Sequence, residues 1–305
     1  LAEKARIDMP YMSKLTGKTE QELFEDLKGV IFLNPMHISE EDGKPKYLPA
    51  DEYLSGNVRE KLRWAKQSAE LYPEDYGENV RALEAVQPVD LTASEISVRL
   101  GATWLPPETI EEFMFELFST PRYCQWNIHV HYAQYTGEWN VEGKSYDRSN
   151  VKAHNTYGTG RVNGYKIMEE TLNLRDVRIF DYIEDGNGRK TAVLNKKETA
   201  IAQGKQELIK QAFVDWIWSD PERREQLTRL YNEKFNSIRP REYDGSHLNF
   251  VGINPEITLR PHQVNAIAHI LYGGNTLLAH VVGAGKTFEM VAAAQESKRL
   301  GLCAE

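Results

Sequence analysis

The sequence is poor in cysteine and contains no long hydrophobic run. Its 305 residues include two cysteines, Cys124 and Cys303, which are too few for a disulfide framework or a four-cysteine zinc site. No apolar run approaches the roughly 20 residues that are needed to span a bilayer. Hydrophobic residues make up 41% of the chain and charged residues 27%, which excludes a disordered tail. We therefore expect a cytoplasmic protein without a membrane segment.

The first residues show neither an initiator methionine nor the pattern of a signal peptide. It begins at Leu1, and the first ten residues show no charged segment followed by an apolar one. A length of 305 residues is enough for about two domains. We interpret the sequence as an internal piece of a longer protein.

Positive charge is scarce in the first part of the chain. Residues 1–120 contain 13 lysines and arginines against 23 acidic residues, whereas residues 189–241 contain 12 against 7. The overall net charge of −8 therefore describes no single surface. This asymmetry predicts different partners for different regions, and the acidic region favours protein contacts over DNA contacts.

Short helices are predicted in the N-terminal region. An amphipathic stretch, Met9–Gly17, ends at a glycine, and Thr19–Glu22 forms a capping box before a second helix. Val30–Leu33 is predicted to be a strand, so this order resembles a winged helix. We expect a further pair of helices at Thr92–Gly101, which opens on a second capping box, and at Pro107–Phe118.

The middle of the chain changes to a period of two. Trp126, Ile128, Val130 and Tyr132 alternate with polar residues, which predicts a half-buried strand. Three more strands are expected at 138–141, 177–182 and 191–194, with a hairpin turn at 185–188 between the last two. A long helical stretch follows from Lys197 to Phe235 and restarts at Pro221. Residues 236–255, rich in turn-forming residues, are predicted to be a linker.

These patterns predict a predominantly helical α+β protein. We expect four segments: a helical region at 1–120, a small module with a mixed or antiparallel sheet at 121–195, a helical connector at 196–245, and the truncated start of a RecA-like domain at 246–305.

The strongest chemical signal is a glycine-rich loop near the C-terminus. Asn275–Val282 has the composition of a buried strand, and the residues after Thr287 favour a helix. The loop between them is Gly283-Ala284-Gly285-Lys286-Thr287. Glycines let successive backbone N–H groups face phosphate oxygens, a lysine neutralises the β- and γ-phosphates, and a threonine hydroxyl binds Mg²⁺. The pattern predicts a site for ATP and Mg²⁺, with Thr287 as the metal-binding side chain through the nucleotide.

One position departs from the general pattern. The first glycine of that pattern is replaced by His280, which we expect to pack at the end of the strand. The alternative is a chance occurrence of the motif at a tight turn, which the predicted strand and helix disfavour.

A second motif precedes the loop. Leu259-Arg-Pro-His-Gln263 leads into an amphipathic helix. A glutamine in this place can hydrogen-bond both edges of adenine, so we predict adenine binding by Gln263 and Arg260. The alternative for Gln263 taken alone is an ordinary surface residue.

Together these two motifs resemble the start of a superfamily 2 helicase or translocase motor. More narrowly, the sequence resembles very large bacterial proteins of phages and conjugative elements, in which such a motor is fused to an N6-adenine DNA methyltransferase. The segments that carry this narrower resemblance are His280–Met290, Tyr243–Leu248, Asp51–Leu62, Tyr157–Thr159 and Thr171–Asn173. The resemblance implies DNA, the rest of the motor and a methyltransferase module as partners, in a bacterial cytoplasm.

Other parts of such a motor are missing. An Asp-Glu pair on a later strand and arginines from a second RecA-like domain are required, and only 19 residues follow Lys286. Asp51-Glu52 is interpreted as a helix start and Gly17-Lys18-Thr19 as a capping turn, while Asn34–His37 does not replace the methyltransferase motif Asn-Pro-Pro-Tyr/Phe. We expect the parent protein to hydrolyse ATP, and this chain alone to bind nucleotide poorly and to show only background ATPase activity.

Weaker groupings remain. His129 and His131 on one strand face could begin a metal site with His154 or Glu138, although an exposed polar face is the favoured interpretation. Aromatic residues could stack nucleobases beside Arg122 and Lys144. The four candidates are Trp126, for which core packing is favoured, Trp139, Tyr132 and Tyr135.

The rival hypothesis is a non-catalytic DNA-binding or protein-interaction scaffold that precedes the motor. It depends on the basic stretch 189–241, where Arg223, Arg224 and Arg229 are the candidate nucleic-acid contacts. A metabolic phosphate-loop enzyme is disfavoured, because no second αβ pattern precedes the loop.

Overall fold

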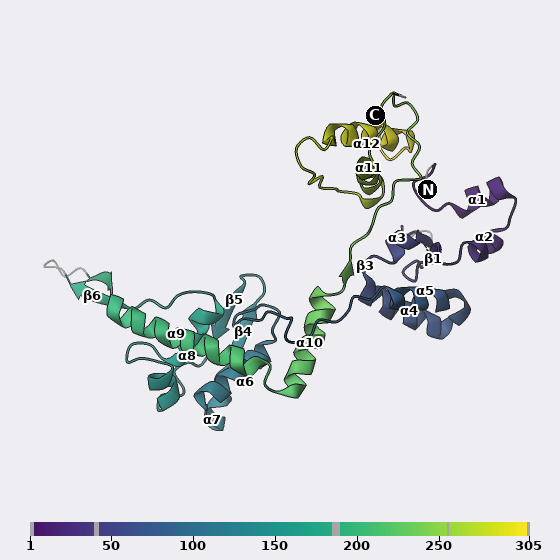
Figure 1. Cartoon of the computed structure of the whole chain (residues 1–305). Coiled ribbons are helices and arrows are strands. Elements are labelled where there is room, and N and C mark those ends of the chain that lie inside the picture. The colour runs from purple at the N-terminus through teal and green to yellow at the C-terminus, as the bar shows by residue number, and fades with distance from the viewer. Residues whose placement is uncertain (1–2, 40–42, 185–189, 255, 304–305) are drawn as a thin grey trace. The chain divides into compact units, whose positions relative to one another are not determined.

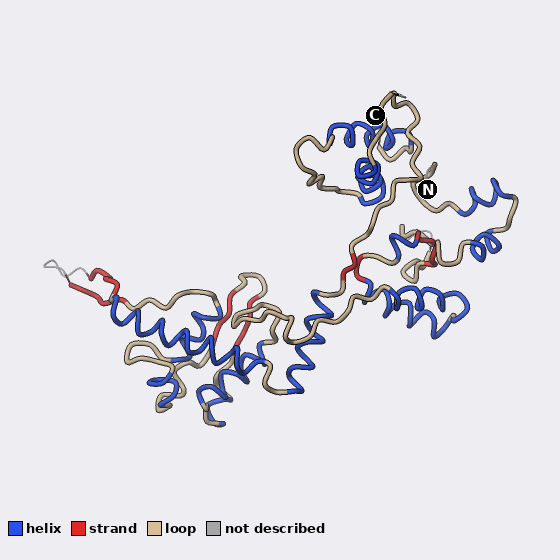
Figure 2. Tube along the Cα trace, in the orientation of Figure 1, coloured by secondary structure: helices blue, strands red, loops and turns tan. Residues whose placement is uncertain are grey.

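The computed structural model describes residues 3–39, 43–184, 190–254 and 256–303, and the chain forms two compact units (Figure 1). Unit 1 contains Leu1–Val89 and Ser237–Glu305, and unit 2 contains Asp90–Asn236. The described residues are mainly helical, with four two-stranded antiparallel sheets, which confirms an α+β fold (Figure 2). No helix in these ranges is long and apolar enough to cross a membrane.

The N-terminal elements of unit 1 follow the local sequence signals. Helix α1 (Met9–Thr16) ends at Gly17, whose φ of 75° suits a residue without a side chain. Helix α2 (Glu20–Asp26) begins with the predicted capping box, in which Thr19 and Glu22 exchange hydrogen bonds of 2.8 and 3.3 Å. Strand β1 (Ile31–Leu33) then pairs with β2 (Tyr47–Pro49). The helix–turn–helix–strand order is therefore confirmed.

A second set of helices in unit 1 packs on its own core. It consists of α3 (Ala50–Tyr53), α4 (Val58–Leu71) and α5 (Pro73–Ala85), and Phe32, Tyr53 and Leu83 are buried among them. Asp51 and Glu52 lie in α3, as the interpretation of a helix start requires. Strand β3 (Gly56–Asn57) pairs with β8 (Ile238–Arg239), and Arg241 bonds Asp51 at 2.8 Å, so the two segments of unit 1 are joined at this point.

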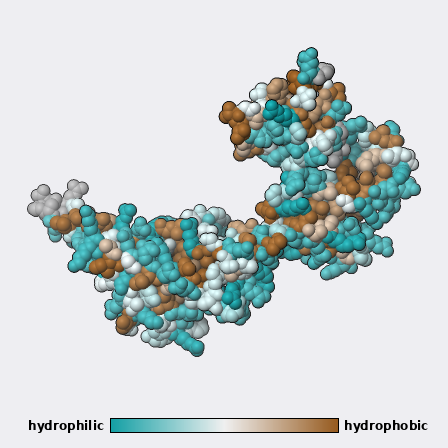
Figure 3. All heavy atoms as spheres, viewed as in Figure 1, coloured by the Kyte–Doolittle hydropathy of each residue, from teal (hydrophilic) through white to brown (hydrophobic). Residues whose placement is uncertain are grey.

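Unit 2 forms one core from segments that the sequence predicted to be separate. Phe113, Val130, Val141 and Phe213 are buried in the same cluster, so the predicted boundaries at 120 and 195 do not divide the unit. Its elements are α6 (Pro107–Phe118), α7 (Arg122–Gln125), β4 (Val130–Ala133), β5 (Glu138–Val141), a π-helical turn (Lys152–Thr156), α8 (Gly164–Leu172), β6 (Phe180–Glu184), β7 (Lys190–Leu194), α9 (Lys196–Ile217) and α10 (Pro221–Phe235). On its visible face hydrophobic residues are scattered among hydrophilic ones (Figure 3).

One buried side chain forms hydrogen bonds that connect the two ends of unit 2. Asn232, on α10, is 2% exposed, and its amide donates to the carbonyl oxygen of Leu91 at 2.9 Å. The backbone N–H of Leu91 donates to the Asn232 side-chain oxygen at 2.8 Å. These bonds fix the entry and exit of the chain in this unit.

Two predicted elements need correction, and a third lies outside the described residues. Residues 92–101 form turns instead of a helix. The Glu95 carboxylate accepts hydrogen bonds from the backbone N–H and the hydroxyl of Thr92, at 2.8 and 2.7 Å. No helix follows within these residues, because Ser94, Ser97 and Val98 are poor helix formers. Asn275–Val282 is not a strand, because no strand of the described residues pairs with it and Val282 is 99% exposed. The predicted turn at 185–188 is the element that lies outside the described residues.

Trp126 and Trp139, in and beside the predicted sheet, lie in other environments than the sequence predicted. Trp126 is 83% exposed, because strand β4 begins only at Val130 and Trp126 follows the short helix α7. Core packing of Trp126 was therefore a wrong prediction. Trp139 on β5 is 3% exposed and packs on Tyr132, so it cannot stack on nucleobases as the sequence left open.

Arg223 has a structural role that its sequence context concealed. It is 9% exposed, its guanidinium lies 3.5 Å from the Trp216 ring centroid, and it donates to the carbonyl oxygens of Trp216 and Ile217 at 2.9 and 3.2 Å. It also pairs with Glu112 at 3.2 Å. Arg223 therefore caps the end of α9 and is not available for nucleic acid.

We predict that Arg223→Ala lowers the free energy of unfolding by about 2–3 kcal/mol, because it removes charged hydrogen bonds from buried carbonyl groups. Urea unfolding followed by circular dichroism measures the change. Arg224→Ala, on the exposed side of α10, is the matched control and should leave stability nearly unchanged. Equal stability of the two variants would contradict a structural role for Arg223.

Candidate phosphate-binding site

The glycine-rich loop lies between two packed helices at the C-terminal end of unit 1. Helix α11 (Pro261–Gly273) and helix α12 (Lys286–Arg299), yellow in Figure 1, share a core of Ile267, Leu271, Ala292 and Ala293. Residues 274–285 connect them. Because the core fixes both helices, it also fixes the two ends of this connection.

The loop enters α12 through backbone conformations that favour glycine. Gly283 and Gly285 have φ angles of 86° and 93°, in the left-handed region. Gly285 is the N-cap of α12, and no side chain caps this end within the described part of the chain. The first N–H groups of a helix have no partners inside it and carry its positive dipole end. The start of α12 therefore presents donors to an anion.

Lys286 and Thr287 occupy the first turn of α12. The Lys286 ammonium folds back and donates to the carbonyl oxygens of His280 and Val281, at 2.8 and 3.2 Å. Thr287 is exposed. The structure thus brings all five predicted loop residues to one helix start, where the positive charge of Lys286 binds two neutral carbonyl groups.

Gln263 connects α11 to this loop. Its side-chain oxygen accepts a hydrogen bond from the N–H of Arg260 at 2.8 Å. Its side-chain nitrogen lies 3.3 Å from the carbonyl oxygens of both Ala284 and Gly285. Gln263 is 6% exposed and both ends of its amide are engaged inside the protein, whereas Arg260 is exposed. Adenine binding by these two residues stays a prediction.

A buried carboxylate forms a second connection that sequence reasoning missed. Glu289 is fully buried in α12 and accepts from His280 Nδ1 at 2.9 and 3.1 Å. His262 lies 3.9 Å from the same carboxylate, and its Nε2 is 3.1 Å from the carbonyl oxygen of Ala284. His280 therefore holds the loop to α12 instead of packing at the end of a strand. The available signal was an acidic residue on the inner face of α12.

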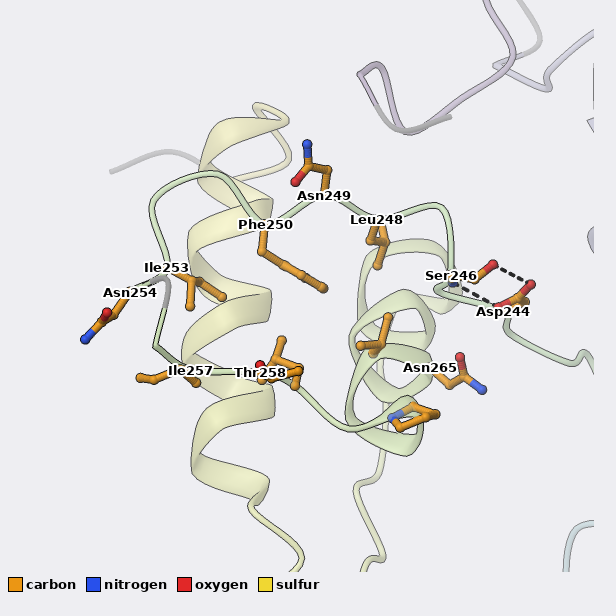
Figure 4. Close-up of a pocket in the computed structure, with 13 residues that line it drawn as sticks. Asp244, Ser246, Leu248, Asn249, Phe250, Ile253, Asn254, Ile257, Thr258 and Asn265 are labelled. Carbon is orange, nitrogen blue, oxygen red and sulfur yellow. Dashed lines mark hydrogen bonds between the residues drawn. The ribbon is translucent and has the colours of Figure 1, made fainter.

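A pocket beside α11 does not include the loop. A cavity of about 600 Å³ lies between residues 244–259 and α11, and Leu248, Phe250 and Ile253 point into it (Figure 4). These three side chains also cover the core of α11 and α12, so the cavity is an open edge of that core. A smaller pocket of about 310 Å³ is lined by Tyr243, His262 and His280 and is adjacent to the loop.

The remaining candidate residues form no metal site among the described residues. Arg224 and Arg229 are exposed on α10 of unit 2. His129 lies 3.4 Å from Glu111 and His131 lies 3.6 Å from Glu142. In the described ranges no group of three histidine, cysteine or acidic residues could hold a metal ion.

Gly285→Ala should destabilise unit 1 more than Gly283→Ala does. Both positions have positive φ, which costs an alanine about 1–2 kcal/mol. An added Cβ at Gly285 would also lie 2.2 Å from the Gln263 side-chain nitrogen, whereas the same atom at Gly283 meets nothing within 4 Å. Chemical unfolding should show the difference, and NMR should show a shifted Gln263 side-chain amide only in Gly285→Ala. Equal effects would contradict the contact between Gln263 and the loop.

Two family models match the chain. Residues 1–39 match the winged helix domain of probable helicases, and residues 99–237 match a domain of unknown function, DUF8437. The second match nearly coincides with unit 2, and neither match includes the glycine-rich loop. No curated protein and no solved structure matches the chain. The first match indicates that this is a helicase-related protein.

Proposed function

We propose that this chain supplies the nucleotide-binding segment of an ATP-dependent DNA helicase or translocase. The observation that carries the proposal is the start of α12, where Gly285 exposes backbone donors, Lys286 adds a positive charge and Gln263 supports the loop. The winged-helix match at residues 1–39 supports a helicase in particular.

The residues of the loop have distinct roles in this proposal. The N–H groups of Gly283–Thr287 bind phosphate oxygens, and Lys286 exchanges the carbonyl groups of His280 and Val281 for the β- and γ-phosphates. A charged phosphate is a stronger partner for an ammonium group than a neutral carbonyl. The Thr287 hydroxyl binds Mg²⁺, which neutralises phosphate charge when it is present.

Gln263 and Arg260 recognise adenine in the same proposal. Because the Gln263 amide already binds Arg260, Ala284 and Gly285, it can bind the edge of a base only by exchanging some of these bonds. Recognition of adenine would then release the carbonyl groups of the loop. Gln263 is thus suited to link the presence of adenine to the conformation of the phosphate loop.

The wider context follows from the family resemblance. We propose that the motor acts on DNA, that it is completed by further parts of the same polypeptide, and that it is linked to an adenine methyltransferase in a bacterial mobile element. The segments Asp51–Leu62 and Tyr243–Leu248 support this part of the proposal.

We predict that Mg²⁺-ATP, at millimolar concentration, shifts the backbone amide NMR signals of Gly283–Thr287 in the full chain. Lys286→Ala should remove these shifts, because the ammonium group no longer neutralises the phosphates, while the spectrum of unit 2 stays unchanged. Lys298→Ala, at the other end of α12, is the control for a general decrease in positive charge. Absent shifts, or shifts that persist in Lys286→Ala, would contradict ATP binding at this loop.

The second candidate is a DNA-binding or protein-interaction scaffold without catalysis. The winged-helix match and the exposed Arg224 and Arg229 favour DNA binding. Helix α2, in contrast, contains Glu20, Glu22, Glu25 and Asp26 and no basic residue, which is unfavourable next to DNA phosphates and favours a protein partner for that helix.

The scaffold hypothesis predicts salt-dependent duplex DNA binding that needs no nucleotide. Replacing Arg224 and Arg229 together by alanine should weaken binding and reduce the slope of log K against log salt by about 0.9 for each phosphate that these arginines neutralise. Fluorescence anisotropy with a labelled duplex measures both quantities. Lys197→Ala, an exposed residue at the start of α9, is the control. Binding that appears only with ATP and requires Lys286 would instead favour the motor.

A further inference from the structure

Three of the exposed aromatic rings of unit 2 lie on adjoining loops, although the core of the same unit is rich in aromatic residues. Trp126, Tyr123 and Tyr146 are 83%, 71% and 62% exposed. Phe113, Phe118, Tyr165 and Phe213, in contrast, are almost completely buried in the core. We call Tyr123, Trp126 and Tyr146 the aromatic surface. Exposing a large aromatic side chain to water is unfavourable in free energy, so exposed rings that lie together indicate a binding surface.

Direct contacts place these rings on two adjoining segments, 119–129 and 142–156. The N–H of Glu142 donates to the carbonyl oxygen of His129 at 2.8 Å. Gly143 touches the segment beside Trp126, since a Cβ built on it would lie 1.9 Å from the Asn127 carbonyl oxygen and 3.1 Å from the Tyr146 ring. Lys152 donates to the Ser119 hydroxyl at 2.8 Å. The two segments therefore form one continuous surface.

A buried polar network holds this surface in place. The Tyr165 hydroxyl donates to the carboxylate of Asp147 at 2.8 Å and lies 2.8 Å from the Thr120 hydroxyl. Burial raises the pKa of Tyr165, so its hydroxyl stays protonated and continues to donate. Thr120 precedes Tyr123 and Trp126, and Asp147 follows Tyr146. Both segments are therefore hydrogen-bonded to the same residue, Tyr165.

The charges around the aromatic surface are mainly positive. Arg122, Arg148 and Lys152 are exposed and take part in none of the ion pairs found among the described residues. These loops contain two acidic residues, Asp147 and Glu142. Asp147 is 2% exposed, and the nearby Lys144 is paired with Glu169. Glu142, at the edge, faces His131. Three exposed cations therefore lie on the same two segments as the rings, with one exposed carboxylate, Glu142, at the edge.

Exposed rings interleaved with cations match the chemistry of an unpaired polynucleotide. Each nucleotide offers a flat base that can stack on an aromatic ring and a phosphate that attracts arginine or lysine. A duplex hides the faces of its bases and cannot use the rings in this way. An apolar protein segment could cover the rings but would leave the three cations without partners.

We propose that the aromatic surface of unit 2 binds single-stranded nucleic acid, with bases stacked on Trp126, Tyr123 and Tyr146 and phosphates bound by Arg122, Arg148 and Lys152. This binding is independent of the proposed nucleotide site, because it lies on different residues and needs no ATP.

The test is fluorescence anisotropy of the full chain with labelled oligothymidylate, oligouridylate and a duplex of equal length, without nucleotide. We expect the single strands to bind more tightly than the duplex, and the two single-strand probes distinguish DNA from RNA. Trp126→Ala and Tyr146→Ala should each weaken binding at least about fivefold, the lower end of the stacking contribution of one base. Arg148→Ala should reduce the salt slope by about 0.7.

Tyr135→Ala is the matched control, since Tyr135 is fully exposed in the turn between β4 and β5 and lies outside the aromatic surface. Its affinity should equal that of the unchanged protein. Thermal unfolding confirms that each variant is folded, which is expected because the replaced rings are exposed. The proposal is overturned if no single strand binds, if the duplex binds equally well, or if Trp126→Ala and Tyr146→Ala retain full affinity. Failure of ATP to bind at Lys286 would leave this result unaffected.

Discussion

The side-chain amide of Gln263 is the interaction on which the candidate phosphate site depends. Its oxygen accepts a hydrogen bond from the N–H of Arg260 at the start of α11. Its nitrogen donates to the carbonyl oxygens of Ala284 and Gly285 at the start of α12. Two helix starts thus share one side chain. Because its nitrogen would lie 2.2 Å from a Cβ at residue 285, this amide would have to move if residue 285 carried a side chain. The bond between His280 and the buried Glu289 adds a second restraint, so the loop is held from both helices.

The basic residues of unit 2 perform different tasks that composition does not distinguish. Arg223 is buried inside the unit, where it donates hydrogen bonds to the carbonyl oxygens of Trp216 and Ile217 at the end of α9. Arg224, its neighbour, is exposed to solvent. Arg122, Arg148 and Lys152 lie beside exposed rings on separate loops. A count of positive charge therefore predicts that a region is basic, and only the packing separates a structural cation from one that can meet a phosphate.

Features that depend on neighbouring residues were predicted well from the sequence. The Gly17 helix end, the Thr19–Glu22 capping box and the start of α10 at Asp220-Pro221 all involve hydrogen bonds within a few residues. The start of α12 after Gly285 follows the same logic. Predictions failed where contacts with residues distant in the sequence determine the structure. The segment 275–282 has the composition of a strand but pairs with no described strand. The environments of Trp126 and Trp139 depend on where β4 begins and on what packs against β5. The contacts of Gln263 and Glu289 join residues across the loop, so the neighbouring sequence does not reveal their partners.

The hydrogen bonds between Asn232 and Leu91 have a consequence for the order of folding. Arg241 and Asp51, which join the two segments of unit 1, are 190 residues apart in the sequence. Bringing the ends of so long a chain together costs conformational entropy, and this cost increases with the number of free residues between them. Once unit 2 is folded, Leu91 and Asn232 near its two ends are already hydrogen-bonded, so the chain that remains to be closed is shorter. We therefore expect β3 to pair with β8 faster when the segment inserted between them is already folded.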